Sequence, residues 1–402
     1  MNKVSRQESK ERNTSSKVVL VRCDSYDLTE IRTALRRGME LLGGIEQFVA
    51  SGEQILLKPN LLSARLPAEN VTTHPNLVRV VAELCQEEGI RLSLGDSSSR
   101  DSWRLVYTRT GMLLLAEELG IALADFETEV PVSFPKGKQN KRFVLARGVV
   151  EVDGIISLPK LKTHHLTRLT AAIKNQFGCI PGILKPEFHV RLPGVEEFSK
   201  MLVDLNRCLQ PRLFILDAIE AMEGNGPGSG ERYPMHLIAI SSDPVALDSA
   251  VCRLLNLSPD LVRTNFYGEQ FGLGWMQAER IELLGDDPKY FLAPKFKIER
   301  APAMPFNLAW RYRLLKNWIS AKPVIEASLC IKCGECVEQC PVAPKALRWG
   351  KSGKQQPPQY DYQSCIRCYC CQEVCRHRAI RVKIPIIRSI LNWFYKNLWM
   401  RL

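Results

Sequence analysis

The chain has 402 residues, of which 45% are hydrophobic and 24% are charged, as in ordinary soluble globular proteins. This length allows two or three domains with a sizeable core, and it excludes a small scaffold that depends on disulfides. The net charge of +12 suits nucleic acid, an anionic membrane surface or an acidic ligand, and nucleic acid ranks last because no nucleic-acid-binding motif is present.

Residues 1–16 are polar and lack an apolar centre, so we expect a flexible tail and not a secretory signal. No run of about twenty apolar residues occurs in the chain, so no transmembrane helix is expected. These two expectations together predict a cytoplasmic protein.

Residues 17–295 alternate short apolar stretches with amphipathic ones, which is the pattern of an α/β domain. Strands are predicted at 17–23, 54–60, 90–99, 153–160, 212–218 and 236–243. Helices are predicted at 28–44, 74–89, 165–178, 195–208 and 244–255. Because the strands are apolar without alternation, we expect a mostly parallel sheet with helices on both faces.

Polar side chains follow most of these predicted strands directly. They are Lys58, Asn60, Asp96, Lys160, Lys162, His164, Lys174, Asn175 and Glu223. The carboxyl ends of parallel strands meet at one edge of a sheet, and open α/β sheets bind their ligands there. We therefore predict a substrate-binding site at this edge, in which the lysines bind an anionic small molecule and Asn60, Asn175 and Glu223 take part.

Each polar stretch also has a purely structural explanation. Residues 58–60 fit a strand exit, Asp96 fits a helix N-cap, and 223–230 fit either a flexible loop or a glycine-rich loop that binds an anion. An anion site is favoured for Lys160 and Lys162, because they directly follow an apolar strand. His164 and Asp96 are the candidate proton-transfer residues, since histidine titrates near neutral pH and an adjacent acid can orient it.

These stretches also carry a resemblance to a known family. They read LLKPNLL at 56–62, THPNLVRVVAELC at 73–85, GDSSS at 95–99, LPKLKTHHLTRLTAAIKNQFG at 158–178 and SSDPVALDSAV at 241–251. Over roughly 17–270 the chain resembles domain-of-unknown-function family 362. The resemblance implies an α/β domain, in many members followed by a ferredoxin module, and it implies no agreed reaction.

Cysteines are concentrated after a linker at 296–325, which includes a predicted basic helix at 307–320. Nine of the 14 cysteines fall between Cys330 and Cys375. Eight of them form two runs with the spacing C-x2-C-x2-C-x3-C: Cys330, Cys333, Cys336 and Cys340, then Cys365, Cys368, Cys371 and Cys375. Zinc sites use two separated pairs, whereas two such runs are typical of [4Fe–4S] ligation.

Residues 326–383 thus resemble a two-cluster ferredoxin domain, in which the fourth cysteine of each run ligates the cluster of the other run. The resemblance assigns one [4Fe–4S] cluster to Cys330, Cys333, Cys336 and Cys375, and a second to Cys365, Cys368, Cys371 and Cys340. Arg376 stands where the family usually has proline, and its positive charge should raise the cluster potential. Cys370 fits either a packed free thiol or a substitute ligand.

Residues 384–402 are basic and amphipathic, with Ile387, Leu391, Phe394 and Leu398 on one helical stripe. Such a helix packs either on the protein's own surface or in a membrane interface. Peripheral membrane contact through this tail is therefore one expectation.

The leading hypothesis is an iron–sulfur oxidoreductase in which two [4Fe–4S] clusters relay electrons to an anionic substrate in the α/β domain. No flavin or nicotinamide fingerprint is visible, so the electrons come from a protein partner or an unrecognised cofactor. The alternatives are an electron carrier or ligand-binding protein without turnover, and clusters with a structural role only. An enzyme is favoured if Lys160, Lys162 and His164 line one cavity with Asp96 and Glu223.

Overall fold

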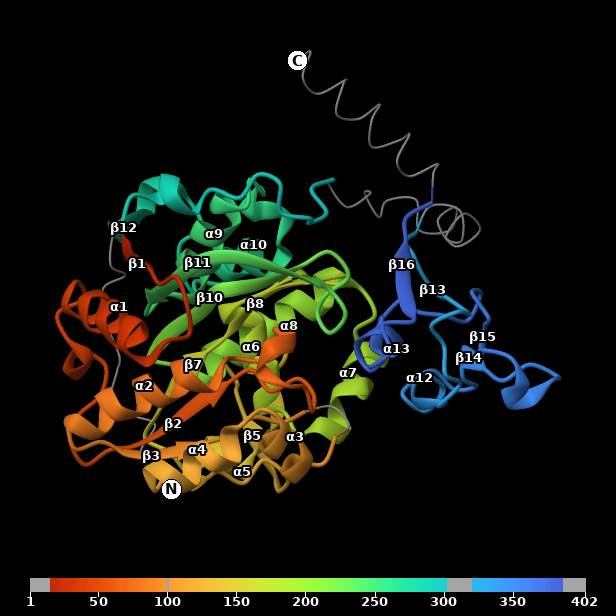
Figure 1. Cartoon of the computed structure of the whole chain (residues 1–402), viewed down its shortest axis with the longest axis horizontal. Helices are drawn as coiled ribbons and strands as arrows, with labels where there is room; N and C mark the ends of the chain where they lie inside the picture. The colour runs from red at the N-terminus through yellow and green to blue at the C-terminus, as the bar shows by residue number, and fades with distance from the viewer. Residues whose placement is uncertain (1–14, 99–100, 302–319, 386–402) are drawn as a thin grey trace, which may run out of the picture.

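The computed structural model describes residues 15–98, 101–301 and 320–385. A large α/β unit occupies the first two ranges, and a small unit lies to one side of it (Figure 1). Three predictions lie wholly or mostly outside the described residues: the N-terminal tail, the basic helix at 307–320 and the amphipathic tail at 384–402. In the described ranges, no helix combines the length and the hydropathy needed to span a bilayer.

A ten-stranded sheet forms the centre of the large unit. Its strands are β1 (Ser16–Arg22), β2 (Gln54–Pro59), β3 (Arg91–Leu94), β4 (Ala122–Leu123), β7 (Gly154–Leu158), β8 (Lys160–His164), β9 (Arg168–Thr170), β10 (Leu213–Glu223), β11 (Glu231–Ser241) and β12 (Ile281–Gly285). The order is β12-β1-β11-β10-β7-β2-β3-β4, with β8 paired to β10 and β9 to β8. Only the β1–β11, β10–β11 and β8–β9 pairings of this sheet are antiparallel, which confirms the mostly parallel prediction.

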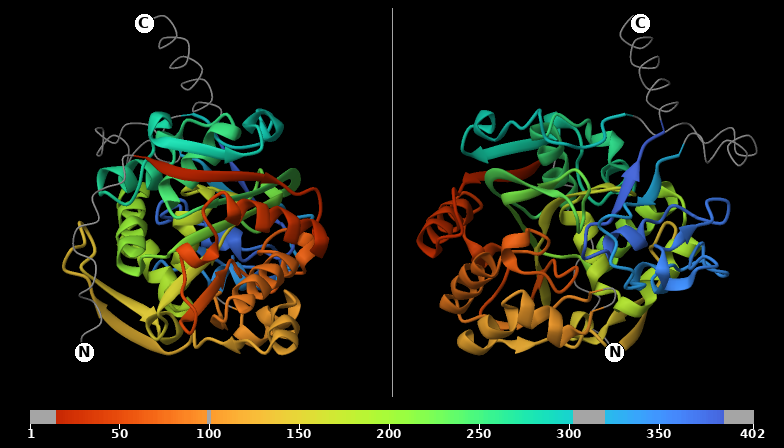
Figure 2. Two further views of the ribbon diagram at one scale, coloured as in Figure 1. Left: turned by 90° about the vertical axis from the view of Figure 1, so that its left-hand side faces the viewer. Right: turned by 45° about the vertical axis from the view of Figure 1, so that its right-hand side comes forward.

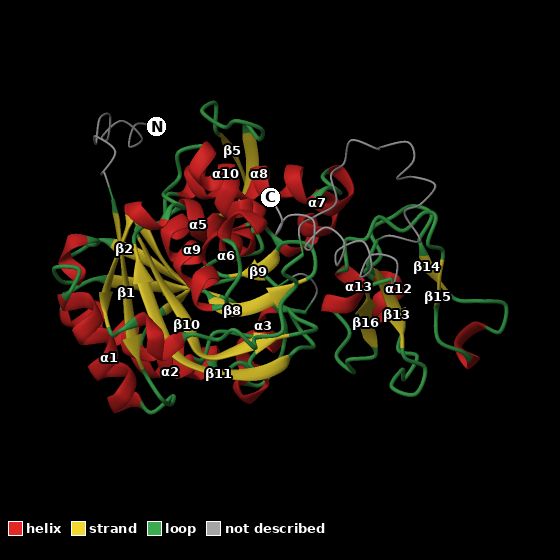
Figure 3. Ribbon diagram, turned by 90° about the horizontal axis from the view of Figure 1, so that it is seen from above, coloured by secondary structure: helices red, strands yellow, loops and turns green. Residues whose placement is uncertain are grey.

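Helices cover both faces of this sheet, as the sequence predicts (Figure 3). One face carries α1 (Leu28–Glu40), α2 (Pro75–Glu87), α3 (Trp103–Arg109) and α4 (Met112–Leu119); the other carries α5 (Arg147–Val150), α6 (Ala172–Asn175), α8 (Val195–Leu209), α9 (Pro244–Leu254) and α10 (Arg263–Gln270). Strand β1 shows why its sequence does not alternate between apolar and polar residues. Val19 and Val21 pack with α1, while Val18 and Leu20 pack with α9 on the opposite face.

The predicted helix at 165–178 is correct only from residue 172 onward, because the first part of this stretch turns back as strand β9. Lys162 of β8 pairs with Thr170 of β9, and α6 begins only at residue 172. Asp248 accepts hydrogen bonds from the N–H groups of Ala172 and Ile173, at 2.7 and 3.1 Å, and so fixes the helix start there. The threonines in this stretch favour a strand over a helix.

The remaining elements of the large unit are a hairpin of β5 (Glu129–Ser133) with β6 (Arg142–Ala146), and helix α7 (Lys185–Arg191). Figure 2 shows the small unit, in blue, near the yellow-green part of the chain that contains α6 and α7. Helix α7 therefore lies in the region between the large sheet and the small unit (Figure 1).

The small unit contains two short antiparallel pairs and two short helices. The pairs are β13 (Lys322–Ile325) with β16 (Ile380–Lys383), and β14 (Leu347–Arg348) with β15 (Gln359–Tyr360); the helices are α12 (Glu335–Glu338) and α13 (Cys370–Glu373). Each helix contains the third cysteine of one run, Cys336 in α12 and Cys371 in α13. Both cysteines pack with Leu347 and Ile380 in the core of this unit.

Candidate functional site

The ends of β2 and β3 bring Lys58 and Asp96 together. The strands are parallel neighbours with Leu57 opposite Leu94, so the residues that follow meet at one sheet edge. Lys58 Nζ lies 2.8 Å from Asp96 Oδ1, and both side chains are buried. Asp96 also accepts a hydrogen bond from the Leu61 N–H at 2.6 Å. Asp96 is therefore the counterion of Lys58, and it does not cap a helix.

Lys160 forms a second buried pair, with Asp217. The two residues are partners across β8 and β10, and Lys160 Nζ lies 3.1 Å from Asp217 Oδ2. Lys160 also donates to the Tyr26 hydroxyl at 2.7 Å, which in turn donates to Asp217 at 2.7 Å. Burial lowers the pKa of Lys160, and the charge of Asp217 opposes that effect. Lys160 is therefore fully engaged inside the sheet.

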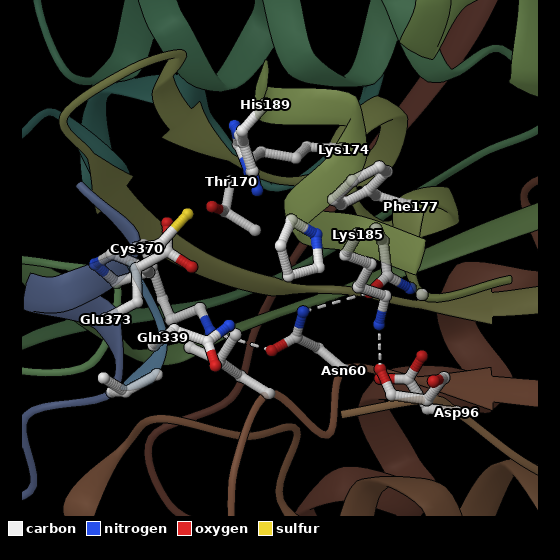
Figure 4. Close-up of a pocket in the computed structure, with 18 residues that line it drawn as sticks. Asn60, Asp96, Thr170, Lys174, Phe177, Lys185, His189, Gln339, Cys370 and Glu373 are labelled. Carbon is white, nitrogen blue, oxygen red and sulfur yellow. Dashed lines mark hydrogen bonds between the residues drawn. The ribbon is translucent and has the colours of Figure 1, made fainter. Parts of the chain in front are cut away.

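A small cavity lies between this sheet edge and the small unit (Figure 4). Its volume of about 60 Å³ corresponds to about two water molecules, at roughly 30 Å³ for each. The large unit contributes Asn60, Leu62, Asp96, Ser97, Lys162, Thr170, Lys174, Asn175, Phe177, Gly178, Lys185, Pro186, His189 and Pro227, and the small unit contributes Gln339, Cys370, Glu373 and Val374. The cavity thus exists only because the two units meet.

Three lysines line this cavity. Their positive charge exceeds the negative charge of the carboxylates around them. Lys162 donates to Asn60 Oδ1 at 2.8 Å and to the Val71 carbonyl at 2.6 Å, and Lys185 donates to the Ser97 carbonyl. Burial, together with nearby cations, lowers the pKa of Lys162 to about 7. Burial likewise lowers the pKa of Lys185 to about 8. Neutral partners therefore leave these ammonium groups poorly compensated.

Lys174 is the third of these lysines. Among the described residues it has no hydrogen-bond or ion-pair partner, and its ammonium lies 5.8 Å from the centre of the Phe177 ring. Burial lowers the pKa of Lys174 as well. The cavity is thus suited to an anion.

Two neutral side chains on the same wall also lack partners. Thr170 and His189 are 4% and 5% exposed, and neither Thr170 Oγ1 nor His189 Nδ1 has a hydrogen-bond partner in the described structure. The His189 ring stacks on Phe198 with a centroid distance of 4.7 Å. Burial lowers the pKa of His189 to about 4, so this imidazole is neutral at pH 7.

His164 connects the large unit to the small one. Its Nδ1 accepts from the N–H groups of Leu166 and Thr167, at 3.1 and 3.3 Å, so the ring proton is on Nε2. Nε2 lies 3.0 Å from Glu373 Oε1. Burial lowers the pKa of His164 to about 3. Burial alone would raise the pKa of Glu373, but the contact with His164 and the charge of Lys174 lower it to about 2.

The glycine-rich stretch after β10 forms part of the same junction. Asn225 Nδ2 donates to the Ile380 carbonyl at 3.0 Å, and Gln372 Nε2 donates to the Asn225 carbonyl at 2.8 Å. The Gly224 and Gly226 N–H groups already donate within the large unit, to the Lys297 carbonyl and to Thr163 Oγ1. The loop therefore docks the small unit and offers neither of these N–H groups to an anion.

Of the residues predicted for the α/β site, five line the cavity: Asn60, Asp96, Lys162, Lys174 and Asn175. Lys58, Lys160, His164 and Glu223 do not, so the single cavity expected of an enzyme, with Lys160, Lys162, His164, Asp96 and Glu223 together, does not form. Glu223 instead lies beside Lys297. The backbone N–H of Lys297 donates a hydrogen bond to the Glu223 carboxylate at 2.8 Å. The structure also places Glu373, and not Asp96, beside His164.

Sequence reasoning missed several residues of the cavity, namely Thr170, Lys185, His189, Gln339 and Glu373, and it did not foresee that Cys370 faces the cavity. One signal was available in the sequence. Lys185 and His189 are four residues apart in α7, a spacing that places two side chains on one helix face. The residues of the small unit carried no such signal, because only docking brings them to this wall.

A separate small cavity is lined by three cysteines of the first run, Cys330, Cys333 and Cys336, together with Cys375 of the second run. These are the four thiols that the ferredoxin resemblance assigns to one cluster. In the second run, Cys371 lies near Cys365 and Cys368, and Cys340 packs against the core that contains Cys371. The first set therefore shares one cavity, as the ligation of an iron–sulfur cluster would require.

Comparison with known sequences decides the family. Residues 55–253 match the model described as domain of unknown function (DUF362). A thylakoid-associated protein of Synechocystis sp. is 36% identical over 263 residues, which are 65% of this chain and 81% of that protein. This chain belongs to the DUF362 family. Residues 329–379 of the DUF362 protein also match the model of a 4Fe-4S dicluster domain.

Other similarities cover smaller parts of the DUF362 protein. An uncharacterised ferredoxin of Methanocaldococcus jannaschii is 33% identical over 61 residues, which are 15% of this chain and 77% of that protein. The lactate racemase apoprotein from Thermoanaerobacterium thermosaccharolyticum superimposes with a TM-score of 0.35 at 11% identity, over 59% of this chain and 56% of that chain. The dicluster match identifies the DUF362 protein as an iron–sulfur protein with a ferredoxin-like domain.

Proposed function

We propose that this protein is an oxidoreductase in which two [4Fe–4S] clusters exchange electrons with an anionic substrate held in the cavity beside α13. One observation carries the proposal: the short helix α13 contributes residues both to the expected cluster site and to the cavity. It contains Cys371, a predicted cluster ligand, and also Cys370 and Glu373, which line the cavity. Clusters of this kind transfer single electrons. A substrate in the cavity would therefore lie next to an electron source.

In this proposal, Cys330, Cys333, Cys336 and Cys375 hold the first cluster, and Cys365, Cys368, Cys371 and Cys340 hold the second. The cavity that the first four thiols share supports this crossed arrangement. The second set has a hydroxyl nearby, because the Tyr360 hydroxyl lies 3.3 Å from Cys371 Sγ. Arg376 is partly neutralised by Asp101, so its influence on a potential is smaller than its charge alone suggests.

The lysines of the cavity would attract and neutralise the substrate. Lys162, Lys174 and Lys185 supply the positive charge, while the Lys58–Asp96 pair fixes the neighbouring backbone. Lys162 is also a better proton donor or acceptor than His164. Its pKa of about 7 lies near neutral pH, and it faces the cavity, whereas His164 has a pKa of about 3. This assignment replaces the His164 and Asp96 pair expected from the sequence.

Electrons would enter from a protein partner at the edge of the small unit. Cys333 is exposed in the described structure, whereas Cys371 is buried behind the interface. The first cluster would thus face a partner and the second would face the substrate. An electron carrier without turnover would use the same exposed edge, so this feature supports both candidate functions.

The proposed location is cytoplasmic with peripheral membrane contact, and this contact is supported by the basic tail and by the Synechocystis relative, a thylakoid-associated protein. Deletion of 384–402 followed by flotation with vesicles that contain phosphatidylglycerol tests this point. We expect the full chain to float at low salt and the shortened chain to float less. If the full chain and the shortened chain float equally, the tail is not a membrane anchor.

Anaerobic purification of the full chain, with iron and sulfide analysis and electron paramagnetic resonance, tests the clusters. About eight iron atoms per chain are expected for two [4Fe–4S] clusters. Cys336→Ser should lose about half of this iron. The matched control is Cys85→Ser, which alters a buried cysteine in α2 and should keep all of it. Zinc in place of iron would overturn the proposal.

A turnover experiment separates the enzyme from the electron carrier. The reduced protein is mixed with small organic acids in their oxidised forms, and cluster reoxidation is followed anaerobically by absorbance. An oxidoreductase should be reoxidised by one class of these acids, and Lys174→Gln should slow that step at least tenfold with unchanged iron content. Reoxidation by protein acceptors alone would favour the carrier.

A further inference from the structure

One end of the cavity is built from polar groups that have no partner within the protein. Thr170 comes from β9, Lys174 from α6 and His189 from α7, and Figure 4 shows them gathered on the side that faces Cys370. Buried polar atoms without partners are rare in folded proteins, because each costs about 1–3 kcal/mol. Two such atoms in one small cavity, Thr170 Oγ1 and His189 Nδ1, next to a lysine without a hydrogen bond among the described residues, are explained most simply by a ligand that completes their hydrogen bonds.

The charge at this end of the cavity favours the binding of an anion. Three lysines line the cavity, and Lys174 forms no salt bridge among the described residues, although the charge of Glu373 raises its pKa and so partly compensates it. Of the two carboxylates in the lining, Asp96 is paired with Lys58, so Glu373 alone faces the three lysines. A cation would meet the unpaired ammonium, whereas a negative ligand would neutralise it.

Two kinds of donor that proteins commonly use for phosphate, arginine side chains and free N–H groups at a helix start, are missing from the described wall. No arginine lines the cavity in the described structure. The first N–H groups of α6, on Ala172 and Ile173, already donate to Asp248. The Gly226 N–H donates to Thr163. The available donors are one ammonium, one hydroxyl and one imidazole N–H, which match the two oxygens of a carboxylate.

The rest of the cavity limits what the carboxylate can be attached to. Its volume is about 60 Å³, and its walls include Phe177, Pro186 and Val374. An apolar surface of this kind suits a few carbon atoms, and the limited space excludes a long chain or a nucleotide. The shape and the chemistry therefore agree on a small organic acid.

We propose that the cavity binds a short-chain monocarboxylate, whose oxygens accept hydrogen bonds from Lys174, Thr170 and His189 while its carbon atoms contact Phe177. This inference rests on the proposed function, for which it names the substrate class. Binding itself requires no electron transfer, so the two proposals are tested by different measurements.

Isothermal titration of the anaerobically purified, iron-loaded full chain tests the site, with formate, acetate, propionate, butyrate, phosphate and sulfate as the probes. We expect saturable binding of acetate or propionate at least tenfold tighter than that of phosphate or sulfate. Thr170→Val should weaken this binding about five- to tenfold and Lys174→Gln at least tenfold. Thr170→Ser keeps the hydroxyl and should restore most of the affinity.

Two control variants match these changes elsewhere in the chain. Thr72→Val removes a threonine hydroxyl that is equally buried and equally without a partner but does not line the cavity. Lys289→Gln removes an exposed lysine, whose side chain is 83% accessible. Both should bind acetate and propionate as the natural chain does. Iron content of every variant verifies that it has folded.

Several outcomes would overturn the inference. Phosphate or sulfate that binds more tightly than every monocarboxylate would refute the ligand class. Iron-loaded protein that binds none of the probes would refute the site, while the iron–sulfur assignment would stand. Conversely, acetate binding in a protein whose clusters never exchange electrons with any organic acid would support this site and refute the proposed oxidoreductase.

Discussion

Two sets of lysines occur at the same sheet edge and differ in their partners. Lys58 and Lys160 each lie within about 3 Å of a buried aspartate, at 2.8 and 3.1 Å. Lys162, Lys174 and Lys185 line the cavity and have neutral partners or none. The first set is part of the fold, and the second is available to a ligand. The number of lysines at a sheet edge therefore does not identify a binding site, whereas lysines without a carboxylate partner do.

The largest predicted effect concerns the paired set. Asp217→Asn should destabilise the protein by about 3–5 kcal/mol, because Lys160 would remain buried without its counterion. Lys174→Gln should cost much less, since Lys174 forms no salt bridge among the described residues and only the more distant charge of Glu373 favours its ammonium. Urea unfolding midpoints of the two variants measure the contrast. Similar losses in both would show that the two sets do not differ.

The pH dependence of stability should reveal Lys162. Burial lowers its pKa from 10.5 to about 7, so between these values the unfolded chain binds the proton more strongly. Stability therefore rises with pH across this window, and the cost of the buried charge is complete below pH 7. Lys162→Met should remove this part of the slope. Unfolding free energies of both proteins from pH 6 to pH 10 measure it.

The result for Lys162 also depends on the charges around it. Lys174 and Lys160 lower its pKa, and Glu373 and Asp96 raise it. An equally steep slope in Lys162→Met would assign the effect to another group. Lys289→Gln serves as the control, because its exposed side chain should leave the slope unchanged.

A smaller effect should accompany carboxylate binding. A bound anion favours the charged forms of Lys162 and Lys185, whose pKa values of about 7 and about 8 lie near the assay pH. Binding at pH 8 should therefore take up a fraction of a proton per ligand. Titrations in two buffers with different ionisation enthalpies measure this uptake, and identical heats would contradict it.

The smallest predicted effect concerns the docking loop. Asn225→Ala removes the hydrogen bond to the Ile380 carbonyl and should weaken docking of the small unit by about 1 kcal/mol. Hydrogen exchange in 320–385 should become faster, with unchanged iron content. Asn76→Ala is the matched control, because Asn76 donates to Tyr26 within the large unit. Faster exchange in both would indicate a general loss of stability.

The sequence predicted the architecture well because the relevant signals are local. Apolar runs such as 54–59 and 213–218 lie within strands that are buried on both faces, and the repeated cysteine spacing identifies the ferredoxin-like domain. The error at 165–178 has a tertiary origin. Asp248, distant in sequence, fixes the start of α6, and pairing with β8 makes residues 168–170 a strand.

By itself, the sequence determined the fold class, the family and the thiols that can hold iron, since each depends on residues close together in the chain. Only the tertiary structure decided which lysines remain uncompensated and which residues share the cavity. Lys160 is engaged by Asp217, and His164 by Glu373 of the other unit. The physical reason is that the state of a buried charge depends on its neighbours in space, which spacing along the chain does not specify.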